Sequence, residues 1–321
     1  MRRLFVLGMV LVFVFGASLA WAQKSVRLSI ATGGTGGVYY PLGGGLANII
    51  SKYIPYAEAT AEVTTASVDN CLLVGRGKAD IAFTMTDTAW DAYKGLGKAF
   101  KDKVNVRSLA VFYPNNMHVV TVEGKRIEKV ADLKGKRVST GAPGSGTEIV
   151  ALRVLEAYGL NPDKDMSRDK LGASESAGAL KDGKIDAYFW VGGLPTASVT
   201  DLAATPGTKI KLIGHMEAVH KMKEKYGPIY VPGIIPAKTY PGQDADVPIV
   251  VLWNLLVVNE TMKENVAYDV VKTMFDHKPE LVMVHGDAEH LSLDPQAAGG
   301  SPIPFHPGAI RYFTEKGLKI K

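Results

Sequence analysis

Two segments of this chain follow one pattern, in which a short apolar strand leads into a loop rich in glycine and hydroxyl side chains and then into an amphipathic helix. They are residues 31–50, ATGGTGGVYYPLGGGLANII, and residues 136–160, KRVSTGAPGSGTEIVALRVLEAYGL. The inward helix faces are expected to carry Leu42, Leu46, Ile49 and Ile50 in the first copy and Ile149, Leu152 and Leu155 in the second. Strands that feed helices through tight loops build parallel sheets, so the pattern predicts an α/β fold.

Further elements extend both copies in the same order. In the first copy, residues 26–31, 62–65 and 81–85 are predicted to be strands, and Ser67 is the expected N-cap of the helix before the last of them. In the second copy, Ser174 is the expected N-cap of a helix that precedes the strand in GKIDAYFWVGG. Each copy is therefore expected to form a β-α-β-α-β unit with a largely parallel sheet.

A second sequence match supports the duplication. GKADIAF at residues 77–83 and GKIDAYF at residues 183–189 both give Gly-Lys, a variable residue, Asp and an apolar strand. Because the matching elements occur in matching order, we expect two similar α/β lobes rather than one large sheet.

Two long apolar stretches bracket the second copy. They are residues 107–122, with a break expected at Pro114-Asn115-Asn116, and residues 247–259. Strands of this kind are what a double crossover between lobes needs, so the C-terminal part is expected to return to the first lobe. The predicted division is a signal peptide at residues 1–22, lobe I at residues 23–117 plus 251–321, and lobe II at residues 118–250.

The N-terminus has the composition of an export signal. Arg2 and Arg3 precede an apolar run from Leu4 to Leu19, and Ala20-Trp21-Ala22 forms a small-x-small cleavage site. The alternative is a retained anchor, but the run is short for a membrane span, and no later stretch is long and charge-free enough to cross a bilayer. We expect a periplasmic protein.

Charge and cysteine content exclude several classes. Without Arg2 and Arg3, the chain has 35 basic and 32 acidic residues, and 35 − 32 gives a net charge of +3. This mild, evenly spread charge argues against a nucleic-acid partner. The single cysteine, Cys71, cannot form an intramolecular disulfide and is expected to be a small buried apolar side chain.

The glycine loops favour a small anion over a nucleotide. The first loop contains Gly33, Gly34, Gly36 and Gly37, which lack a Cβ and can adopt unusual backbone angles or approach a ligand closely. Neither loop has the Gly-Lys-Ser/Thr ending of a P-loop or the G-x-G-x-x-G of a dinucleotide site. The loops could be simple tight turns, but their duplication and their hydroxyl residues favour a ligand site at the helix N-termini.

Enzyme and metal chemistry lack the residues that they need. Ser145 follows a strand, but Pro143 and Thr147 stand where a nucleophile elbow has glycine. The histidine pairs, His215 with His220 and His285 with His290, are spaced by five residues, which does not match the zinc-binding spacing of four. Among the aromatic residues, Trp190 is expected at the cleft and Phe189 in the core.

The chain resembles the TAXI-type solute receptors of TRAP transporters, which deliver organic acids to a sodium-coupled permease. The resemblance rests on ATGGTGGVYYPLGGGLA at 31–47, SVDN at 67–70, GKADIAF at 77–83, GAPGSGTE at 141–148, GKIDAYFWVGG at 183–193 and PFHPGAIRYFTEKG at 304–317. A departure is Cys71, where a larger apolar residue is more usual.

The resemblance implies a type II-like periplasmic-binding-protein fold, with two α/β lobes joined by two crossover strands around a central ligand cleft. It implies an acidic amino acid or a dicarboxylate as ligand. The expected ligand-binding residues are Thr35, Gly36, Gly37, Tyr39, Gly144, Ser145, Gly146 and Thr147, with looser assignments at Ser67, Asn70, Thr86 and Trp190. Since neither loop contains an arginine, backbone amides and hydroxyls must carry the ligand's charge.

We therefore expect a non-enzymatic receptor that captures a small carboxylate by lobe closure. Glutamate-like or glutamine-like molecules, dicarboxylates and 2-oxo acids are candidates, and a TRAP-type permease is the expected partner. The main alternative is an ABC-type or sensor-associated periplasmic binding protein for another organic anion; an enzyme and a structural or adhesive protein are the other rival classes. We expect a monomer with no cofactor and no metal.

Overall fold

The computed structural model describes residues 26–320. The expected signal peptide and its cleavage site lie outside these residues. Within residues 26–320, no helix has both the length and the apolar character needed to cross a membrane.

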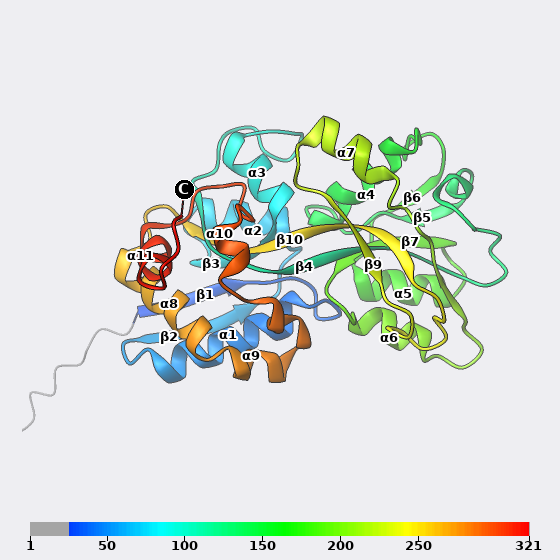
Figure 1. The fold of residues 1–321 in the computed structure, drawn as a ribbon. Coiled ribbons are helices and arrows are strands. Elements are labelled where there is room, and N and C mark those ends of the chain that lie inside the picture. The colour runs from blue at the N-terminus through cyan, green and yellow to red at the C-terminus, as the bar shows by residue number, and fades with distance from the viewer. Residues whose placement is uncertain (1–25, 321) are drawn as a thin grey trace, which may run out of the picture.

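The strands form one hydrogen-bonded sheet of ten strands in the order β2-β1-β3-β10-β4-β7-β5-β6, with β8 beside β4 and β9 beside β10 (Figure 1). The strands are β1 Val26–Ala31, β2 Ala57–Glu62, β3 Ile81–Met85, β4 Val106–Val122, β5 Arg137–Ser139, β6 Ser167–Asp169, β7 Ala187–Gly192, β8 Ile210–Leu212, β9 Val231–Ile235 and β10 Val247–Asn259.

The two ends of this sheet repeat one topology. At one end, β2, β1 and β3 are parallel and β10 lies antiparallel to β3. At the other end, β6, β5 and β7 are parallel and β4 lies antiparallel to β7. The expected similarity of the two lobes is therefore confirmed. The expectation that they form separate sheets is wrong, because β4 and β10 pair with each other and join them.

The crossover strands are long and uninterrupted. In Figure 1, β4 and β10 run side by side through the middle of the molecule, from the blue and cyan half into the green half. The break expected at Pro114 is wrong, since β4 is continuous from Val106 to Val122. Pro114 cannot donate to the ladder, and the register of the pair shifts between Trp253 and Leu255, beside Pro114, which accommodates it.

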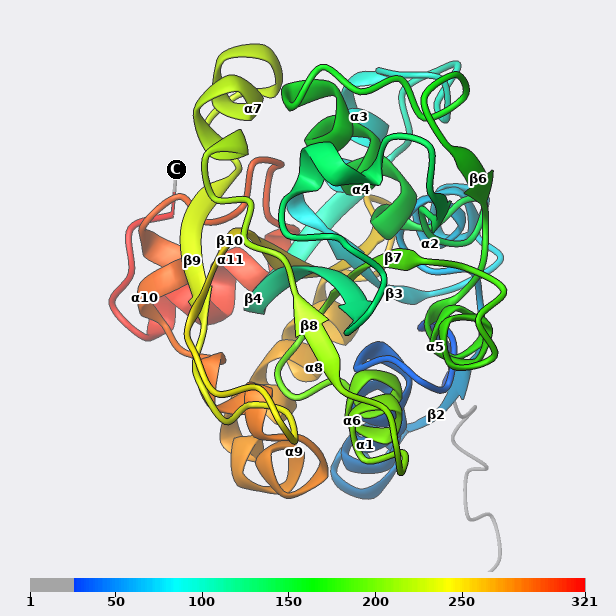
Figure 2. The same ribbon diagram turned by 90° about the vertical axis from the view of Figure 1, so that its right-hand side faces the viewer.

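Helices cover both faces of the sheet (Figures 1 and 2). They are α1 Tyr39–Tyr53, α2 Ser67–Gly75, α3 Thr86–Lys94, α4 Gly146–Ala157, α5 Ala173–Lys181, α6 Ala197–Ala203, α7 Ala218–Tyr226, α8 Glu264–Asp276, α9 Lys278–Val284, α10 Asp294–Ala297 and α11 Pro307–Glu315, with 3-10 turns η1 Val130–Leu133 and η2 Gly286–His290. In the second half, α4 packs on one face through residues near Phe189, while α5 and α6 pack on the other near Tyr188.

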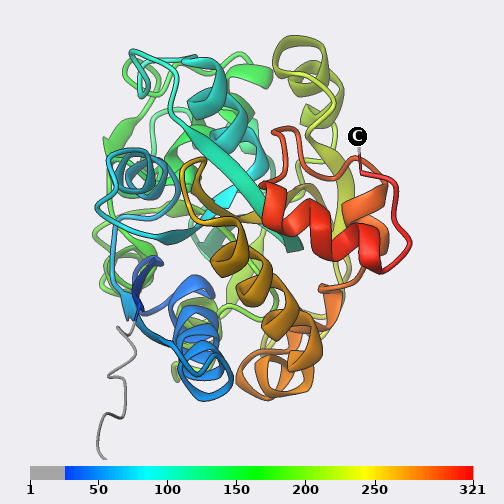
Figure 3. The same ribbon diagram turned by 90° about the vertical axis from the view of Figure 1, so that its left-hand side faces the viewer.

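The C-terminal segment returns to the first half, as expected. Figure 3 shows α11 lying against α8, and the two helices are in contact with each other. A backbone bridge between Ser108 and Phe305 fixes the segment to β4. In α11, Arg311 and Glu315 form the expected i, i+4 ion pair, with Nε to Oε1 at 3.3 Å.

The repeated Gly-Lys-x-Asp motif performs the same task twice. Asp80 Oδ2 accepts a hydrogen bond from the backbone N–H of Ser29 at 2.8 Å, which joins the start of β3 to β1. Asp186 Oδ2 accepts from the N–H of Arg137 at 3.0 Å, which joins the start of β7 to β5. The duplicated sequence therefore encodes a duplicated strand junction.

Several local predictions were wrong by a few residues. Strand β2 lies at Ala57–Glu62 rather than at 62–65, and its alternation uses only alanine as the apolar residue. The N-caps of α2 and α5 are Ala66 and Gly172, so Ser67 and Ser174 lie one and two residues inside the helices. In α4, Val150, Ala151, Val154 and Leu155 face the core, while Ile149 and Leu152 are half-buried.

The apolar cores separate the two halves of the sheet. The largest core combines residues of 28–113 with residues of 255–313. Two further cores lie in the second half, and Met85 is the residue of β3 that packs with one of them. Cys71 is fully buried, which confirms its expected structural role. The lobe boundaries stay a prediction, which this separation supports.

Candidate functional site

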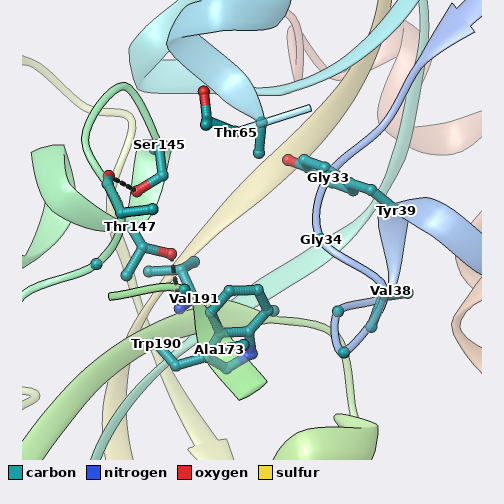
Figure 4. A pocket seen from close by; sticks show the side chains of 18 of the residues that line it. Gly33, Gly34, Val38, Tyr39, Thr65, Ser145, Thr147, Ala173, Trp190 and Val191 are labelled. Carbon is teal, nitrogen blue, oxygen red and sulfur yellow. Dashed lines mark hydrogen bonds between the residues drawn. The ribbon is translucent and has the colours of Figure 1, made fainter. Parts of the chain in front are cut away.

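A cavity of about 290 Å³ lies between the two halves of the molecule. Figure 4 shows Tyr39 and Val38 on one wall and Ser145, Thr147 and Trp190 on the facing side. Of the residues expected to bind a ligand, the lining includes Thr35, Gly36, Gly37, Tyr39, Ser145, Gly146, Thr147 and Trp190.

Four helices begin at this cavity. The N-caps of α1, α2, α4 and α5 are Val38, Ala66, Ser145 and Gly172, and all four belong to the lining. Each helix lies in a β-α-β unit, so each begins beyond the carboxyl end of a strand, the place where open α/β sheets bind ligands. Unpaired amides and aligned peptide dipoles make such a position favourable for negative charge.

Some of these amides are free to bind a ligand. Within residues 26–320, the backbone N–H groups of Tyr39, Gly146 and Thr147 have no hydrogen-bond acceptor. The N-terminus of α2 differs, because the carbonyl of Gly144 accepts from Val68 N at 3.1 Å and from Asp69 N at 3.3 Å. Gly144 therefore lies outside the lining and connects the second loop to the first half of the molecule.

Two glycines of the first loop, Gly36 and Gly37, are explained by close approach rather than by backbone angle. Gly33, Gly34, Gly36 and Gly37 do not adopt the left-handed conformation. A Cβ on Gly36 would lie 2.1 Å from Ser174 Oγ, and a Cβ on Gly37 would lie 3.0 Å from the ring of Trp190. At Gly36 and Gly37, side chains of the second half pack directly against the loop.

The three loop hydroxyls have different roles. Ser145 Oγ accepts from Glu148 N at 3.2 Å and donates to the carbonyl of Ala142 at 2.7 Å, so its donor is used. Thr147 Oγ1 accepts from Val191 N at 3.3 Å, which leaves its hydroxyl hydrogen available. Thr35 is exposed and makes no side-chain hydrogen bond within the part of the chain that the structure describes.

The remaining predicted residues lie behind the cavity wall. Asn70 is fully buried and donates to the carbonyls of Thr32 and Phe83, at 2.7 Å each. It therefore fixes the strand ends that carry the first loop. Ser67 and Thr86 are buried with hydroxyls that have no partner among residues 26–320, and neither belongs to the lining.

The floor of the cavity contains polar residues that the sequence patterns did not single out. Tyr113 and Asn115 on β4 line it, and Asn254 on β10 lies beside them. The hydroxyl of Tyr39 donates to Asn254 Oδ1, so the floor is tied to the start of α1. Asparagines inside two otherwise apolar strands were the signal that could have identified this group.

The charge of the lining comes from one carboxylate. No Lys, Arg or His belongs to the lining as described, and Glu175 is its only Asp or Glu. Glu175 Oε2 would lie 2.4 Å from a Cβ on Gly172, so this carboxylate folds back over the N-terminus of its own helix α5. The first turns of α2 and α4 contain Asp69 and Glu148, but neither residue belongs to the lining.

A buried ion-pair cluster joins α3 to α4 beside the cavity. Arg153 Nη1 lies 3.3 Å from Asp87 Oδ2, and Arg153 Nη2 also contacts Asp91. Tyr230 donates to Asp87 Oδ2 at 2.7 Å. Burial raises the pKa of Asp91 to about 6, although the positive charge of Arg153 opposes this shift.

A second contact joins η2 to the loop after β7. Asp287 Oδ2 accepts from Leu194 N at 2.9 Å, and His285 Nε2 donates to the carbonyl of Pro195 at 3.2 Å. Burial raises the pKa of Asp287 to about 7. A Cβ on Gly193 would lie 1.6 Å from Asp287 Oδ2, so this glycine is what admits the carboxylate.

Ser145 has no histidine partner within residues 26–320. Both hydrogen bonds of Ser145 Oγ are made to backbone groups rather than to a histidine. His215 is buried, with Nδ1 2.9 Å from the carbonyl of Ile213, and His220 is exposed. Among residues 26–320, no three His, Cys, Asp or Glu residues lie close enough together to hold a metal ion.

Several solved structures resemble this chain in fold. A protein from Listeria monocytogenes, described as an L-cystine ABC transporter, matches with a TM-score of 0.50 at 15% identity over 83% of this chain and 98% of its own. A protein from Bordetella bronchiseptica matches with a TM-score of 0.50 at 18% identity over 91% and 80%. The periplasmic aliphatic sulphonate binding protein SsuA from Escherichia coli gives 0.45 at 14% identity over 90% of each chain.

These likenesses concern the fold alone, which is the expected two-lobed periplasmic-binding-protein fold. The family is a separate finding. The model of the NMT1-like family matches residues 30–317, which include both glycine loops, both crossover strands and the returning C-terminal helices. The chain therefore belongs to the NMT1-like family.

Proposed function

We propose that this protein is a periplasmic solute receptor that captures a small carboxylate between its two lobes and presents it to a membrane permease. The observation that carries the proposal is the cavity between the halves, at which four helices begin and whose described lining contains no cationic side chain. Amide groups at helix N-termini bind anions without a basic residue.

The size of the cavity supports a small ligand. Its volume of about 290 Å³ lies just below the range of roughly 300–1,000 Å³ typical of ligand sites. The free amides of Gly146 and Thr147, the hydroxyl of Thr147 and the exposed hydroxyl of Thr35 are the groups that we assign to the carboxylate. Trp190 and Gly37 would close over the ligand's apolar part.

Residues behind the lining have an indirect role in this proposal. Asn70 supports the first loop, Ser67 lies against Gly146 of the second loop, and Thr86 begins α3 beside the cluster that contains Asp87. Gly144 contributes through its carbonyl, which pairs with α2 and holds the halves together. We propose that lobe I comprises residues 23–117 plus 251–321, and lobe II residues 118–250.

We favour an ABC-type permease as the partner. The Listeria protein that shares the fold at a TM-score of 0.50 is described as belonging to an ABC transporter, which supports this alternative. A TRAP-type permease is the second candidate, and the loop sequence at residues 31–47 is the observation that favours it. Uptake that stops when ATP is depleted, with the sodium gradient held, supports the first; uptake that stops when sodium alone is removed supports the second.

A thermal-shift screen tests the ligand class. The probes are glutamate, glutamine, 2-oxoglutarate, C4 dicarboxylates, short monocarboxylates, an alkanesulfonate, sugars and simple cations. A ligand present at 100 times its Kd stabilises the folded state by about 2.7 kcal/mol, which raises Tm by several degrees. We expect at least one carboxylate to do so; stabilisation by a sugar or a cation but by no acid contradicts the proposal.

A further inference from the structure

Two residues that line the cavity carry a buried polar atom without a partner among residues 26–320. Tyr113 and Asn115 are 0% and 1% exposed, and both belong to the lining. Among residues 26–320, neither the Tyr113 hydroxyl nor Asn115 Oδ1 has a hydrogen-bond partner. Buried polar groups are nearly always paired, so two unpaired atoms in one ligand cavity point to groups that the ligand supplies.

The hydrogen-bond network determines which atom of Asn115 is unpaired. Asn254 Nδ2 donates to the backbone carbonyl of Tyr113 at 3.3 Å, and a carbonyl can only accept, so the orientation of the Asn254 amide is fixed. Asn254 Oδ1 then accepts from Asn115 Nδ2. The orientation of Asn115 follows, and its Oδ1 is the atom left without a donor.

The hydroxyl of Tyr39 belongs to the same network. It donates to Asn254 Oδ1, so that oxygen receives two donors, while the contact of Asn254 Nδ2 with the Tyr113 carbonyl fixes the amide orientation. Burial keeps the pKa of Tyr113 well above its usual value, so its hydroxyl stays protonated at physiological pH. The floor therefore presents one obligatory acceptor beside one neutral hydroxyl.

The two ends of the cavity thus differ in chemistry. The helix N-termini offer N–H and O–H donors, for example from Gly146 and Thr147. The floor offers the acceptor Asn115 Oδ1, which repels a carboxylate or keto oxygen and binds an N–H or O–H group. The cavity is small enough for one ligand to span both ends.

We propose that Asn115 and Tyr113 form a subsite for a hydrogen-bond donor on the ligand, so that this protein selects carboxylates that carry an ammonium or hydroxyl group over unsubstituted acids and 2-oxo acids. This inference rests on the proposed function and narrows it to amino acids and hydroxy acids. An ammonium group and a hydroxyl group share the donor chemistry, and the test below distinguishes them.

Calorimetry with matched acids tests the subsite in the wild-type protein. One series is L-glutamate, 2-hydroxyglutarate, 2-oxoglutarate and glutarate, and the other is L-alanine, L-lactate, pyruvate and propionate. Within a series that binds, we expect the amino or hydroxy acid to bind about 10-fold or more tightly than the unsubstituted and oxo acids, the effect of leaving one buried polar group unpaired. Whether the amino acid or the hydroxy acid binds more tightly shows whether the subsite prefers an ammonium or a hydroxyl group.

Tyr113→Phe removes one member of the subsite, and Tyr188→Phe is its matched control. Tyr188 is also fully buried with a hydroxyl that has no partner in the described chain, but it lies outside the cavity lining. Neither variant loses a hydrogen bond, so both are expected to keep the Tm of the ligand-free protein. Only Tyr113→Phe should weaken binding of the amino or hydroxy acid, by about 5-fold to 10-fold, without weakening binding of the unsubstituted acid.

The possible results separate the inference from the proposed function. If unsubstituted or oxo acids bind as tightly as their amino and hydroxy counterparts, the donor subsite is refuted and the carboxylate receptor stands. The same holds if Tyr113→Phe and Tyr188→Phe bind every probe equally well. If neither these eight acids nor any other carboxylate of the thermal-shift screen binds the wild-type protein, the carboxylate site is refuted and the subsite with it.

Discussion

Ser145 shows how one side chain can serve the fold while its position suggests ligand binding. Its hydroxyl caps α4 by accepting from Glu148 N, and its hydrogen is given to the carbonyl of Ala142. It therefore has no donor left for a carboxylate. The second loop instead offers its amides and the hydroxyl of Thr147.

A pair of substitutions at Ser145 separates capping from binding. Ser145→Ala removes the cap and is expected to lower the free energy of unfolding by about 1 kcal/mol. Ser145→Asp keeps a capping acceptor and should retain stability, but its carboxylate competes with the ligand at the same helix N-terminus. Urea unfolding and calorimetry measure both properties; an aspartate variant that binds the acid as tightly as wild type contradicts the assigned anion site.

For single residues, the sequence predicted which side chains lie at the cavity better than it predicted what each of them does there. Glycine and hydroxyl residues in the loops were expected near the ligand, and most of them line the cavity. Tyr113 and Asn115 were missed because Pro-Asn-Asn is typical of a turn, whereas here it continues a strand. Whether a hydroxyl hydrogen is free depends on distant backbone carbonyls, which no local pattern encodes.

Among the elements, the contact between α3 and α4 depends on a few charges. The side chains of Arg153, Asp87 and Asp91 are 11%, 0% and 9% exposed, so these charges are paired out of water. Removing one partner of such a cluster leaves an uncompensated buried charge.

We therefore expect Arg153→Met to lower the free energy of unfolding by about 3–5 kcal/mol at pH 8. The loss should shrink toward pH 5, because without Arg153 the pKa of Asp91 rises further above the unfolded value of about 3.9. In the folded variant the Asp91 carboxyl then binds a proton that it has lost in the unfolded chain. The variant therefore loses stability as the pH rises from about 4 through the pKa of Asp91 in the folded state. Urea unfolding across this pH range measures the change in the free energy of unfolding.

The control is Lys209→Met, which removes an ion pair with Glu123 whose side chains are 62% and 57% exposed. Exposed pairs contribute about 0–1 kcal/mol, so this variant should unfold nearly as wild type does. A loss in Arg153→Met no larger than in the control would show that the buried cluster is not what joins α3 to α4.

The positions of elements were predictable where apolar residues define them. Strands β1, β3 and β10 have the expected bounds because apolar residues mark them: they alternate with polar residues in β1 and make up most of β3 and β10. Strand β2, AEATAE, carries alanine as its only apolar residue, so its pattern gave no clear boundary. In α4, two overlapping i, i+4 stripes were available, and packing against Phe189 and Val138 selected the one with Val150 and Val154.

For the molecule as a whole, the approach of the two loops is sterically tight. A Cβ on Gly146 would lie 2.7 Å from Ser67 Oγ and 2.8 Å from Met85 Sδ, both in the first half. A Cβ on Gly178 in α5 would have no atom within 4 Å, so an alanine fits there without a clash.

We expect Gly146→Ala to keep the lobes apart. The variant should bind the acid found in the screen about 10-fold or more weakly, because the added Cβ either prevents closure of the lobes or strains the closed state. The stability of the ligand-free protein should change little. Small-angle scattering with saturating ligand should show a larger radius of gyration than in wild type. Gly178→Ala should bind the acid as tightly as wild type does and gain up to about 1 kcal/mol of stability. If both variants become equally compact with ligand, the close contact at Gly146 is not what limits closure.

The duplicated topology was predictable from the two loops and the two Gly-Lys-x-Asp motifs. The joining of both lobes into one sheet was not, because it depends on pairing between β4 and β10, which are far apart in sequence. The same pairing brings Asn115 beside Asn254, which forms the cavity floor.

The unbroken ladder through β4 and β10 has a mechanical consequence. Two separate flexible linkers would allow the lobes to move freely relative to each other. A hydrogen-bonded pair of strands is stiffer and resists bending between the lobes. Opening of the lobes would then have to bend or twist β4 and β10. A transporter that docks on both lobes at once would have to supply the energy needed to bend these two strands before the ligand could leave.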